Sequence, residues 1–299
     1  MPKIEVKTWS TPAVEEERRF VPCAVCGSLA FKPGLACGNF AYVRCVRCGL
    51  TQMNPQPVPE AVQRRYGEAY GADYFSYETA HEAAFLQLQI RSLRDAGFFD
   101  WEKTLLPSPE AAPPHGAPRF LDIGCATGAL LQYVRERGWE VQGVEISPPQ
   151  AEYARRERGL AVSALPLEEN RFSGNFFTAV HASHLIEHLN DPASLVREAR
   201  RILAPGGRFW VTTPNIAGFQ ARLFGSRWRS AIFDHLYLFS TKTLTALLHT
   251  SGLRKEKIVT WGGLAAGTAP TPVKRIADRL AKCAGAGDVM LIRAVKDSV

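Results

Sequence analysis

The sequence contains no long apolar run. No stretch approaches about 18 uninterrupted apolar residues, the length that a membrane-spanning helix needs. The first 19 residues also lack the apolar core of a secretion signal, and no internal repeat is evident. With 46% hydrophobic and 22% charged residues, the composition is ordinary for a globular domain. We therefore expect a cytoplasmic globular protein without a membrane span.

Acidic residues are scarce in the last part of the chain. Residues 214–299 contain 13 Lys and Arg but only five Asp and Glu, whereas the preceding residues are close to neutral. This segment therefore carries the whole of the +7 net charge. A positive face of this kind favours an anionic partner, such as a nucleotide-linked sugar, a phosphorylated glycan or nucleic acid. The alternative is a solvated basic surface with no partner.

Four of the seven cysteines form two matching pairs. Cys23 and Cys26, like Cys45 and Cys48, are separated by two residues and followed by glycine. This spacing is typical of a four-cysteine zinc site. Four thiolates fill the tetrahedral shell of zinc, so the metal would be structural. Redox dithiols and disulfides are the alternatives, and the lack of a secretion signal argues against disulfides. We predict a small zinc ribbon over residues 20–52.

The rest of the chain divides by composition and pattern. Residues 1–19 resemble a leader, and residues 53–118 combine a tyrosine-rich helical connector with a proline-rich linker. Residues 119–299 alternate between predicted strands and helices, which predicts an α/β fold: a Rossmann-like, seven-stranded, mostly parallel sheet with helices on both faces. The expected strands are 119–123, 139–144, 160–164, 176–182, 207–213, 256–261 and 287–294. The expected helices are 129–137, 148–158, 192–203 and 241–251.

A glycine turn follows the first of these strands. Asp122 ends the apolar run, Gly124 and Gly128 frame the turn, and Glu145 ends the next strand. Glycines at the start of a helix let a ligand approach backbone N–H groups. An acidic residue at the end of the next strand can accept hydrogen bonds from ribose hydroxyls. The third glycine of the dinucleotide fingerprint is absent. The pattern therefore favours another nucleoside ligand, the alternative being an ordinary strand–loop–helix joint.

These residues resemble motif I of the class I S-adenosylmethionine-dependent methyltransferases, D-x-G-x-(G/A)-x-G. Residues 184–192, 203–209 and 234–240 also look like segments of that family. Together with the cysteine pairs, they resemble a bacterial subset with an N-terminal zinc ribbon. That subset is often associated with methylation of sugars or cell-surface glycans.

The resemblance implies S-adenosylmethionine as cofactor and structural Zn²⁺ in the ribbon. It also implies a small or medium anionic acceptor, with a sugar or a cell-surface glycan precursor as the first choice. The residues it places at the cofactor are Asp122, Gly124, Cys125, Ala126, Gly128, Glu145 and Ile146, with Ala164 and Leu165 near the adenine. Ala126 stands where many members have glycine, a change that the turn should tolerate.

Methyl transfer to a hydroxyl needs a group that takes up the proton, and histidine is the usual one near neutral pH. His188 is the first candidate, with Glu187 as its neighbour or orienter, and His184 is the second. His235, beside Tyr237, is a further candidate from the C-terminal half. The alternatives are that Glu187 and His188 only cap the following helix, or that alignment alone suffices.

Two other functions fit parts of the sequence. An RNA base methyltransferase acting on ribosomal RNA is one, because a zinc ribbon joined to this fold also occurs there. Arg222, Arg227, Trp228 and Arg229 interleave basic and aromatic residues as nucleic-acid surfaces do. A non-catalytic binding protein that has lost its cofactor is the other, and the intact glycine turn with Glu145 argues against it.

Overall fold

A computed structural model describes residues 16–65, 68–106, 116–263 and 271–298. The expected leader therefore lies outside the described residues up to residue 15, as does the expected linker over residues 107–115. The helices are α1 (Pro59–Arg65), α2 (Glu68–Asp95), α3 (Phe98–Leu105), α4 (Ala129–Arg135), α5 (Pro148–Arg158), α6 (Pro192–Ile202), α7 (Phe219–Phe224), α8 (Thr241–Thr250) and α9 (Thr271–Cys283). The strands are β1 (Arg18–Arg19), β2 (Phe31–Cys37), β3 (Phe40–Cys45), β4 (Thr51–Met53), β5 (Gln56–Pro57), β6 (Arg119–Ile123), β7 (Glu140–Val144), β8 (Val162–Ser163), β9 (Phe177–Ser183), β10 (Leu203–Pro214), β11 (Tyr237–Leu238), β12 (Arg254–Trp261) and β13 (Val289–Val295).

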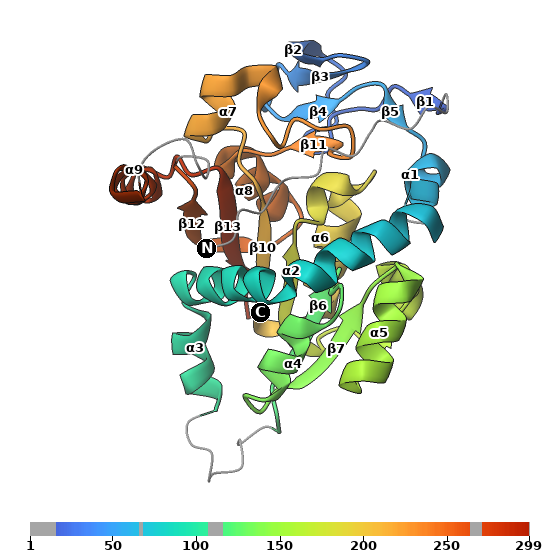
Figure 1. Ribbon diagram of the computed structural model, residues 1–299, viewed down its shortest axis with the longest axis vertical. Coiled ribbons are helices and arrows are strands. Elements are labelled where there is room, and N and C mark those ends of the chain that lie inside the picture. Colours follow the sequence, from blue (N-terminus) through green and yellow to red (C-terminus); the bar gives the residue numbers. More distant parts are fainter. Residues whose placement is uncertain (1–15, 66–67, 107–115, 264–270, 299) are drawn as a thin grey trace.

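The largest sheet has seven strands in the order β12-β13-β10-β9-β6-β7-β8 (Figure 1). Strands β6 to β10 pair in parallel, and β13 is antiparallel to both of its neighbours, β10 and β12. The expected mostly parallel seven-stranded sheet is confirmed. Because β6 lies beside both β7 and β9, its carboxyl end is where the strand order changes direction, the usual place for a ligand in an open α/β sheet.

Two hydrophobic cores cover the two faces of this sheet. Successive side chains of a strand point to opposite faces, so Phe120 enters one core and Leu121 the other. The core around Phe120 is completed by residues of α2 to α5. The core around Leu121 is completed by α6, α8 and the cysteine-bearing module. The helices therefore lie on both faces, as predicted.

Some expected boundaries are wrong. The segment from Leu203 to Gly206 is predicted to end a helix and form a loop, but it begins β10, with a break in register between Leu203 and Arg208. Arg18 and Arg19 were assigned to the leader, yet they pair with β5. Helices α7 and α9 were not predicted, because much of their apolar surface faces outward and gives no inward-facing pattern.

The cysteine-bearing module forms most of a second, four-stranded sheet. Its order is β11-β4-β3-β2, so a strand from the C-terminal half extends the module's three strands. Its buried Tyr42 donates a hydrogen bond to the backbone oxygens of Ile232 (2.7 Å) and His235 (2.9 Å). The backbone N–H of Met53 donates to the oxygen of Leu236 (2.8 Å). The module is thus hydrogen-bonded to residues 232–238.

No helix in the described ranges combines the length and apolar content needed to cross a membrane.

Replacing Tyr42 by phenylalanine tests this connection. Tyr42→Phe leaves two buried carbonyls without their shared donor, which costs about 1–3 kcal/mol of unfolding free energy. Urea unfolding of Tyr42→Phe should show that loss. Tyr153→Phe on α5, where the hydroxyl makes no hydrogen bond to a described residue, should leave the unfolding free energy unchanged. Equal stability of the two variants would contradict the connection.

Candidate active site

The turn between β6 and α4 depends on left-handed backbone. Gly124 (φ +74°), Ala126 (φ +48°) and Gly128 (φ +78°) all have positive φ. A Cβ on Gly128 would lie 2.5 Å from Cδ1 of Leu160, so that position accepts only glycine without rearrangement. Ala126 adopts the same region as its neighbours, as expected for a tolerated substitution. At the carboxyl end of β6, Gly124 and Ala126 are the partly exposed residues of the turn, and Gly128 is buried.

The side chain of Glu145 lies next to this turn. One carboxylate oxygen accepts the N–H of Ala126 (3.0 Å) and the other accepts the N–H of Ser147 (2.8 Å). Burial raises the pKa of Glu145, and these two N–H groups oppose the rise. Each oxygen keeps a further lone pair. The carboxylate is therefore held in place with capacity to accept hydroxyl groups such as those of a ribose.

Asp122 is engaged inside the sheet. Its Oδ1 lies 2.7 Å from Nδ1 of His181 on the adjacent strand, and both side chains are buried. Burial raises the pKa of Asp122, and His181 opposes this rise. Asp122 therefore joins β6 to β9 beneath the turn rather than presenting its carboxylate at the surface, and His181 is the core histidine that its strand position suggests.

Apolar residues follow the carboxyl ends of β7 and β8, the two neighbouring strands next to Glu145. Ile146 and Leu165 are exposed large hydrophobic residues, and Ala164, just before Leu165, is half-buried. Exposed aliphatic groups beside a held carboxylate could cover a flat aromatic base. Cys125 is buried, and its Sγ packs against Gly143, so it has a packing role.

Helix α2 crosses the turn, which the sequence did not predict (Figure 1). Glu82 on α2 accepts the hydroxyl of Thr127 in the turn and Nη2 of Arg158 from α5 (2.6 Å). Arg158 also donates to the backbone oxygen of Thr127 (2.8 Å). These contacts join residues 82, 127 and 158 and brace the turn. Their only sequence signal is the helical pattern around Glu82, which does not indicate where the helix lies.

A fully buried carboxylate lies beyond the end of β9. Glu187, in the short 3₁₀ turn Ile186–His188, accepts the hydroxyl of Thr213 at the end of β10 (2.9 Å) and faces Nδ1 of His184 (3.3 Å). Burial alone would raise the pKa of Glu187. The hydrogen bond from His184 and the charges of His188, His184 and His235 outweigh it and lower the pKa to about 2. The Glu187 carboxylate therefore stays negatively charged near neutral pH, close to three histidines.

Two of these histidines have defined orientations. Nδ1 of His188 lies 3.0 Å from the backbone oxygen of Asp234, and Nδ1 of His235 lies 2.8 Å from that of Ser230. A carbonyl only accepts, so each Nδ1 carries its hydrogen and each neutral ring keeps a lone pair on Nε2. The two rings meet edge to face, with centroids 4.7 Å apart. Burial, followed by the charge of His188, lowers the pKa of His235 to about 3.

Glu187, His188 and His235 form a compact polar cluster. One possible ligand atom from each lies within 4.8 Å of the others, close enough for the three residues to surround a cation. The alternative that Glu187 and His188 cap α6 and hydrogen-bond the backbone holds only in its second half. Asp191 caps α6 by accepting a hydrogen bond from the N–H of Ser194 (3.0 Å), whereas His188 does hydrogen-bond the backbone. The carbonyl of Asp234 orients His188, and Glu187 acts on it by charge.

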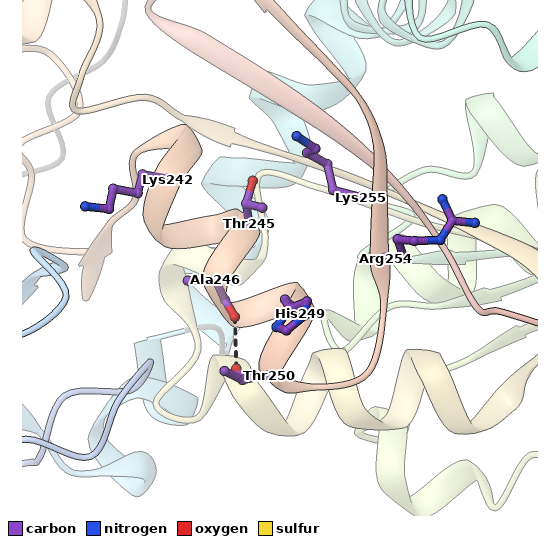
Figure 2. A pocket seen from close by; sticks show the side chains of 7 residues that line it. All are labelled: Lys242, Thr245, Ala246, His249, Thr250, Arg254 and Lys255. Atoms are coloured by element: carbon purple, nitrogen blue, oxygen red, sulfur yellow. Dashed lines mark hydrogen bonds between the residues drawn. The ribbon is translucent and has the colours of Figure 1, made fainter.

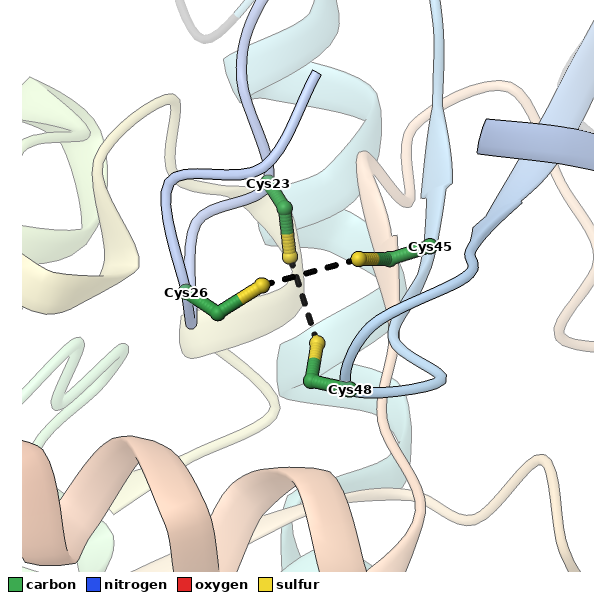
Figure 3. Close-up of side chains that lie close together, drawn as sticks. All are labelled: Cys23, Cys26, Cys45 and Cys48. Atoms are coloured by element: carbon green, nitrogen blue, oxygen red, sulfur yellow. Dashed lines mark hydrogen bonds between the residues drawn. The ribbon is translucent and has the colours of Figure 1, made fainter. Parts of the chain in front are cut away.

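The four predicted zinc ligands converge (Figure 3). The Sγ atoms of Cys23 and Cys48 are 3.3 Å apart, those of Cys26 and Cys45 are 3.6 Å apart, and all four lie within 4.8 Å of one another. A tetrahedron with Zn–S bonds of about 2.3 Å has edges of about 3.8 Å, so the four sulfurs fit zinc. Against burial, the N–H groups of Cys48 and Arg47 help to lower the pKa of Cys45 to about 6.

A separate pocket lies between α8 and β12 (Figure 2). It is lined by Lys242, Thr245, Ala246, His249, Thr250, Arg254 and Lys255. These residues are distant in the fold from the turn and the histidines, at the edge strand of the sheet. The basic excess of the C-terminal segment is therefore spread over several elements, and part of it surrounds this pocket.

Comparison with other proteins identifies the family. A family model described as a methyltransferase domain matches residues 90–258. A ubiquinone biosynthesis O-methyltransferase of Alkalilimnicola ehrlichii is 35% identical over 103 residues, which cover 32% of this chain and 42% of that protein. One from Pseudomonas aeruginosa is 31% identical over 103 residues, covering 32% and 44%. The chain thus spans less than half the length of these curated relatives.

Solved structures show the same fold. A methyltransferase of Thermotoga maritima, described as a possible histamine N-methyltransferase, has a TM-score of 0.55 and 22% identity, covering 79% of this chain and 100% of that one. An S-adenosylmethionine-dependent methyltransferase of Archaeoglobus fulgidus has a TM-score of 0.52 and 20% identity, covering 75% and 99%. With the family model matching more than half of its 299 residues, the chain belongs to the class I S-adenosylmethionine-dependent methyltransferase family.

Proposed function

We propose that this protein methylates a hydroxyl group of a small or medium anionic acceptor, a sugar or a cell-surface glycan precursor. The observation that carries the proposal is the cluster of Glu187, His188 and His235 at the same edge of the sheet as the glycine turn. The names of the relatives, which are O-methyltransferases, support oxygen as the acceptor atom. The basic C-terminal segment supports an anionic acceptor.

The cofactor is proposed to lie across the turn. Gly124 and Ala126 leave backbone accessible, and the buried Gly128 lets α4 begin close to Leu160. Glu145 accepts hydrogen bonds from the ribose hydroxyls, and Ile146 and Leu165 cover the adenine, with Ala164 beside it. Asp122 contributes indirectly, because its hydrogen bond with His181 holds β6 against β9 beneath the turn. When bound, S-adenosylmethionine supplies an electrophilic methyl group. The protein's task is then to align the acceptor and exclude water.

The histidine cluster is proposed to take up the acceptor's proton. The Nε2 lone pair of His188 accepts it, the carbonyl of Asp234 keeps the ring oriented, and the negative charge of Glu187 stabilises the resulting imidazolium. His184 faces Glu187, and its side chain is half-exposed to solvent. His235 has a lowered pKa and stays neutral beside His188.

An RNA acceptor has weaker support. The aromatic residue of the basic segment, Trp228, is buried, and its Nε1 donates to Asp288. The neighbouring Arg229 also pairs with Asp288 (2.6 Å). A buried indole offers no face for stacking with a base, which is how such segments bind single strands.

Removing the Glu145 carboxylate tests the cofactor site. Glu145→Ala should weaken binding of S-adenosylhomocysteine by about 1–3 kcal/mol, because ribose contacts to a charged group are lost. Isothermal titration calorimetry measures this directly. Glu140→Ala, at the exposed opposite end of the same strand, is the matched control. Unchanged affinity in Glu145→Ala would remove this residue from the site.

Zinc in the cysteine module is part of the proposal. The sulfur distances and the two glycine turns, Gly27 (φ +68°) and Gly49 (φ +84°), are those that two zinc knuckles require. Each glycine N–H donates to the backbone oxygen of the first cysteine of its pair, at 2.8 and 3.0 Å. The metal would stabilise a module whose strands form hydrogen bonds with residues 232–238.

Replacing one ligand tests the zinc site. Cys45→Ser should lower the zinc content of the purified protein and the unfolding temperature, because three thiolates hold the metal less tightly. Cys37→Ser, between the two pairs and outside the cluster, should keep one zinc per chain by elemental analysis. Stoichiometric zinc in Cys45→Ser would refute the four-cysteine site.

The base is tested by a variant that keeps the hydrogen bond to Asp234. His188→Gln should lower kcat on the order of 10²–10⁴-fold without weakening cofactor binding, because a positioned base contributes about that much. His249→Gln, exposed on α8, should retain full activity. Equal kcat for the two variants would show that His188 is not the base.

The acceptor itself is tested by transfer of a labelled methyl group. Nucleotide-linked sugars, sugar phosphates, phenols and ribosomal RNA would be offered separately, with mass identification of each product. Label on a sugar oxygen supports the proposal. Label on RNA, or on a nitrogen or carbon atom, overturns the proposed acceptor and leaves the family assignment intact.

A further inference from the structure

Helix α9 exposes its large apolar residues to solvent. Val273, Ile276 and Leu280 recur at helical spacing and are between 51% and 64% exposed. The residue that packs inward is the small Ala281, against the edge strand β12, where its backbone oxygen accepts from Thr260 (3.5 Å). A helix normally buries its large apolar residues. This one buries a small residue and presents the large ones outward.

Helix α7 adds a second exposed apolar group beside it. Phe219, Leu223 and Phe224 are exposed. The N–H of Phe219 donates to the backbone oxygen of Ala286 (2.9 Å), three residues past the end of α9, and Figure 1 shows both helices on the same side of the molecule. We call the six residues on the two helices the α7–α9 face. Grouped exposed hydrophobic residues mark an interaction site.

Positive charges outnumber negative ones around the α7–α9 face, although Arg229 pairs with Asp288. Residues 219–229 contain three arginines and no acidic residue, and α9 contains four basic residues and one aspartate. Within the described part of the chain, Arg222, Arg227 and Arg279 are exposed and make no ion pair. Lys274 pairs with Asp278 and Lys282 with Asp95.

We propose that the α7–α9 face docks onto an anionic lipid bilayer. Aliphatic and aromatic residues flanked by unpaired arginines are the pattern of helices that lie in a membrane interface, where apolar groups enter the acyl boundary and cations meet lipid phosphates. A second copy of the chain fits less well, because a two-fold contact would bring like charges together. Nucleic acid would satisfy the arginines but leave Val273, Ile276 and Leu280 in water.

Docking here would place the candidate site near the membrane. Strand β10 ends at Pro214 beside the histidine cluster, and α7 begins five residues later. The face therefore lies at the edge of the sheet where the acceptor is proposed to bind. Vesicle binding by this face does not depend on which acceptor the site methylates.

Flotation with lipid vesicles tests the inference on the full chain. Vesicles of phosphatidylcholine with phosphatidylglycerol should carry the protein upward, and vesicles of phosphatidylcholine alone should carry much less. Leu280→Ser should lower the bound fraction at least about fivefold, since it removes apolar insertion. Leu88→Ser, a 52% exposed leucine on α2, is its matched control and should bind like the unaltered protein.

A charge pair completes the test. Arg279→Glu should weaken binding to the anionic vesicles several-fold, whereas Arg156→Glu on α5, also exposed, should not. All four positions are exposed, so unfolding temperatures should be unchanged. No binding to anionic vesicles, or equal binding by Leu280→Ser and Leu88→Ser, overturns the inference. Self-association or RNA binding that Leu280→Ser abolishes, without vesicle binding, also overturns it.

Discussion

The buried carboxylate of Glu187 holds the candidate site together. Its side chain accepts a hydrogen bond from the hydroxyl of Thr213 near the end of β10 and faces His184 after β9. Its backbone oxygen accepts a hydrogen bond from the N–H of Leu236 (2.8 Å), the residue just before β11. Three segments that are distant in sequence therefore meet at one residue. A buried charge is tolerated only where it is paired and hydrogen-bonded. Here the hydrogen-bond partners are Thr213 and His184, and the charge acts on His188, the residue proposed to take up the proton.

The same arrangement gives the cysteine module a role in the site. Its strand β4 pairs with β11, and its Tyr42 donates to the carbonyl of His235. His235 in turn packs against His188. Loosening the module would therefore disturb the histidine cluster without touching the cofactor turn. Stability of the module and activity are linked through these few hydrogen bonds.

Local features of the fold follow from the sequence, and contacts between distant segments do not. Strand β6 and helix α5 have their expected bounds, because apolar periodicity and the proline and glycine at the ends of α5 specify them locally. The meeting of Glu187 with Thr213, and of Glu82 with Arg158, depends on strand order and helix placement. The sequence singled out Asp122 but not its partner, since pairing with His181 is a matter of register.

A structure of the complex with S-adenosylhomocysteine tests the central claim most directly. The account predicts that both ribose hydroxyls donate to Glu145 and that the sulfur atom faces the Nε2 atoms of His188 and His235. The contrary result is a ligand seated away from Glu145, or one whose sulfur faces away from the histidines. Either would show that the carboxylate–histidine cluster does not serve methyl transfer.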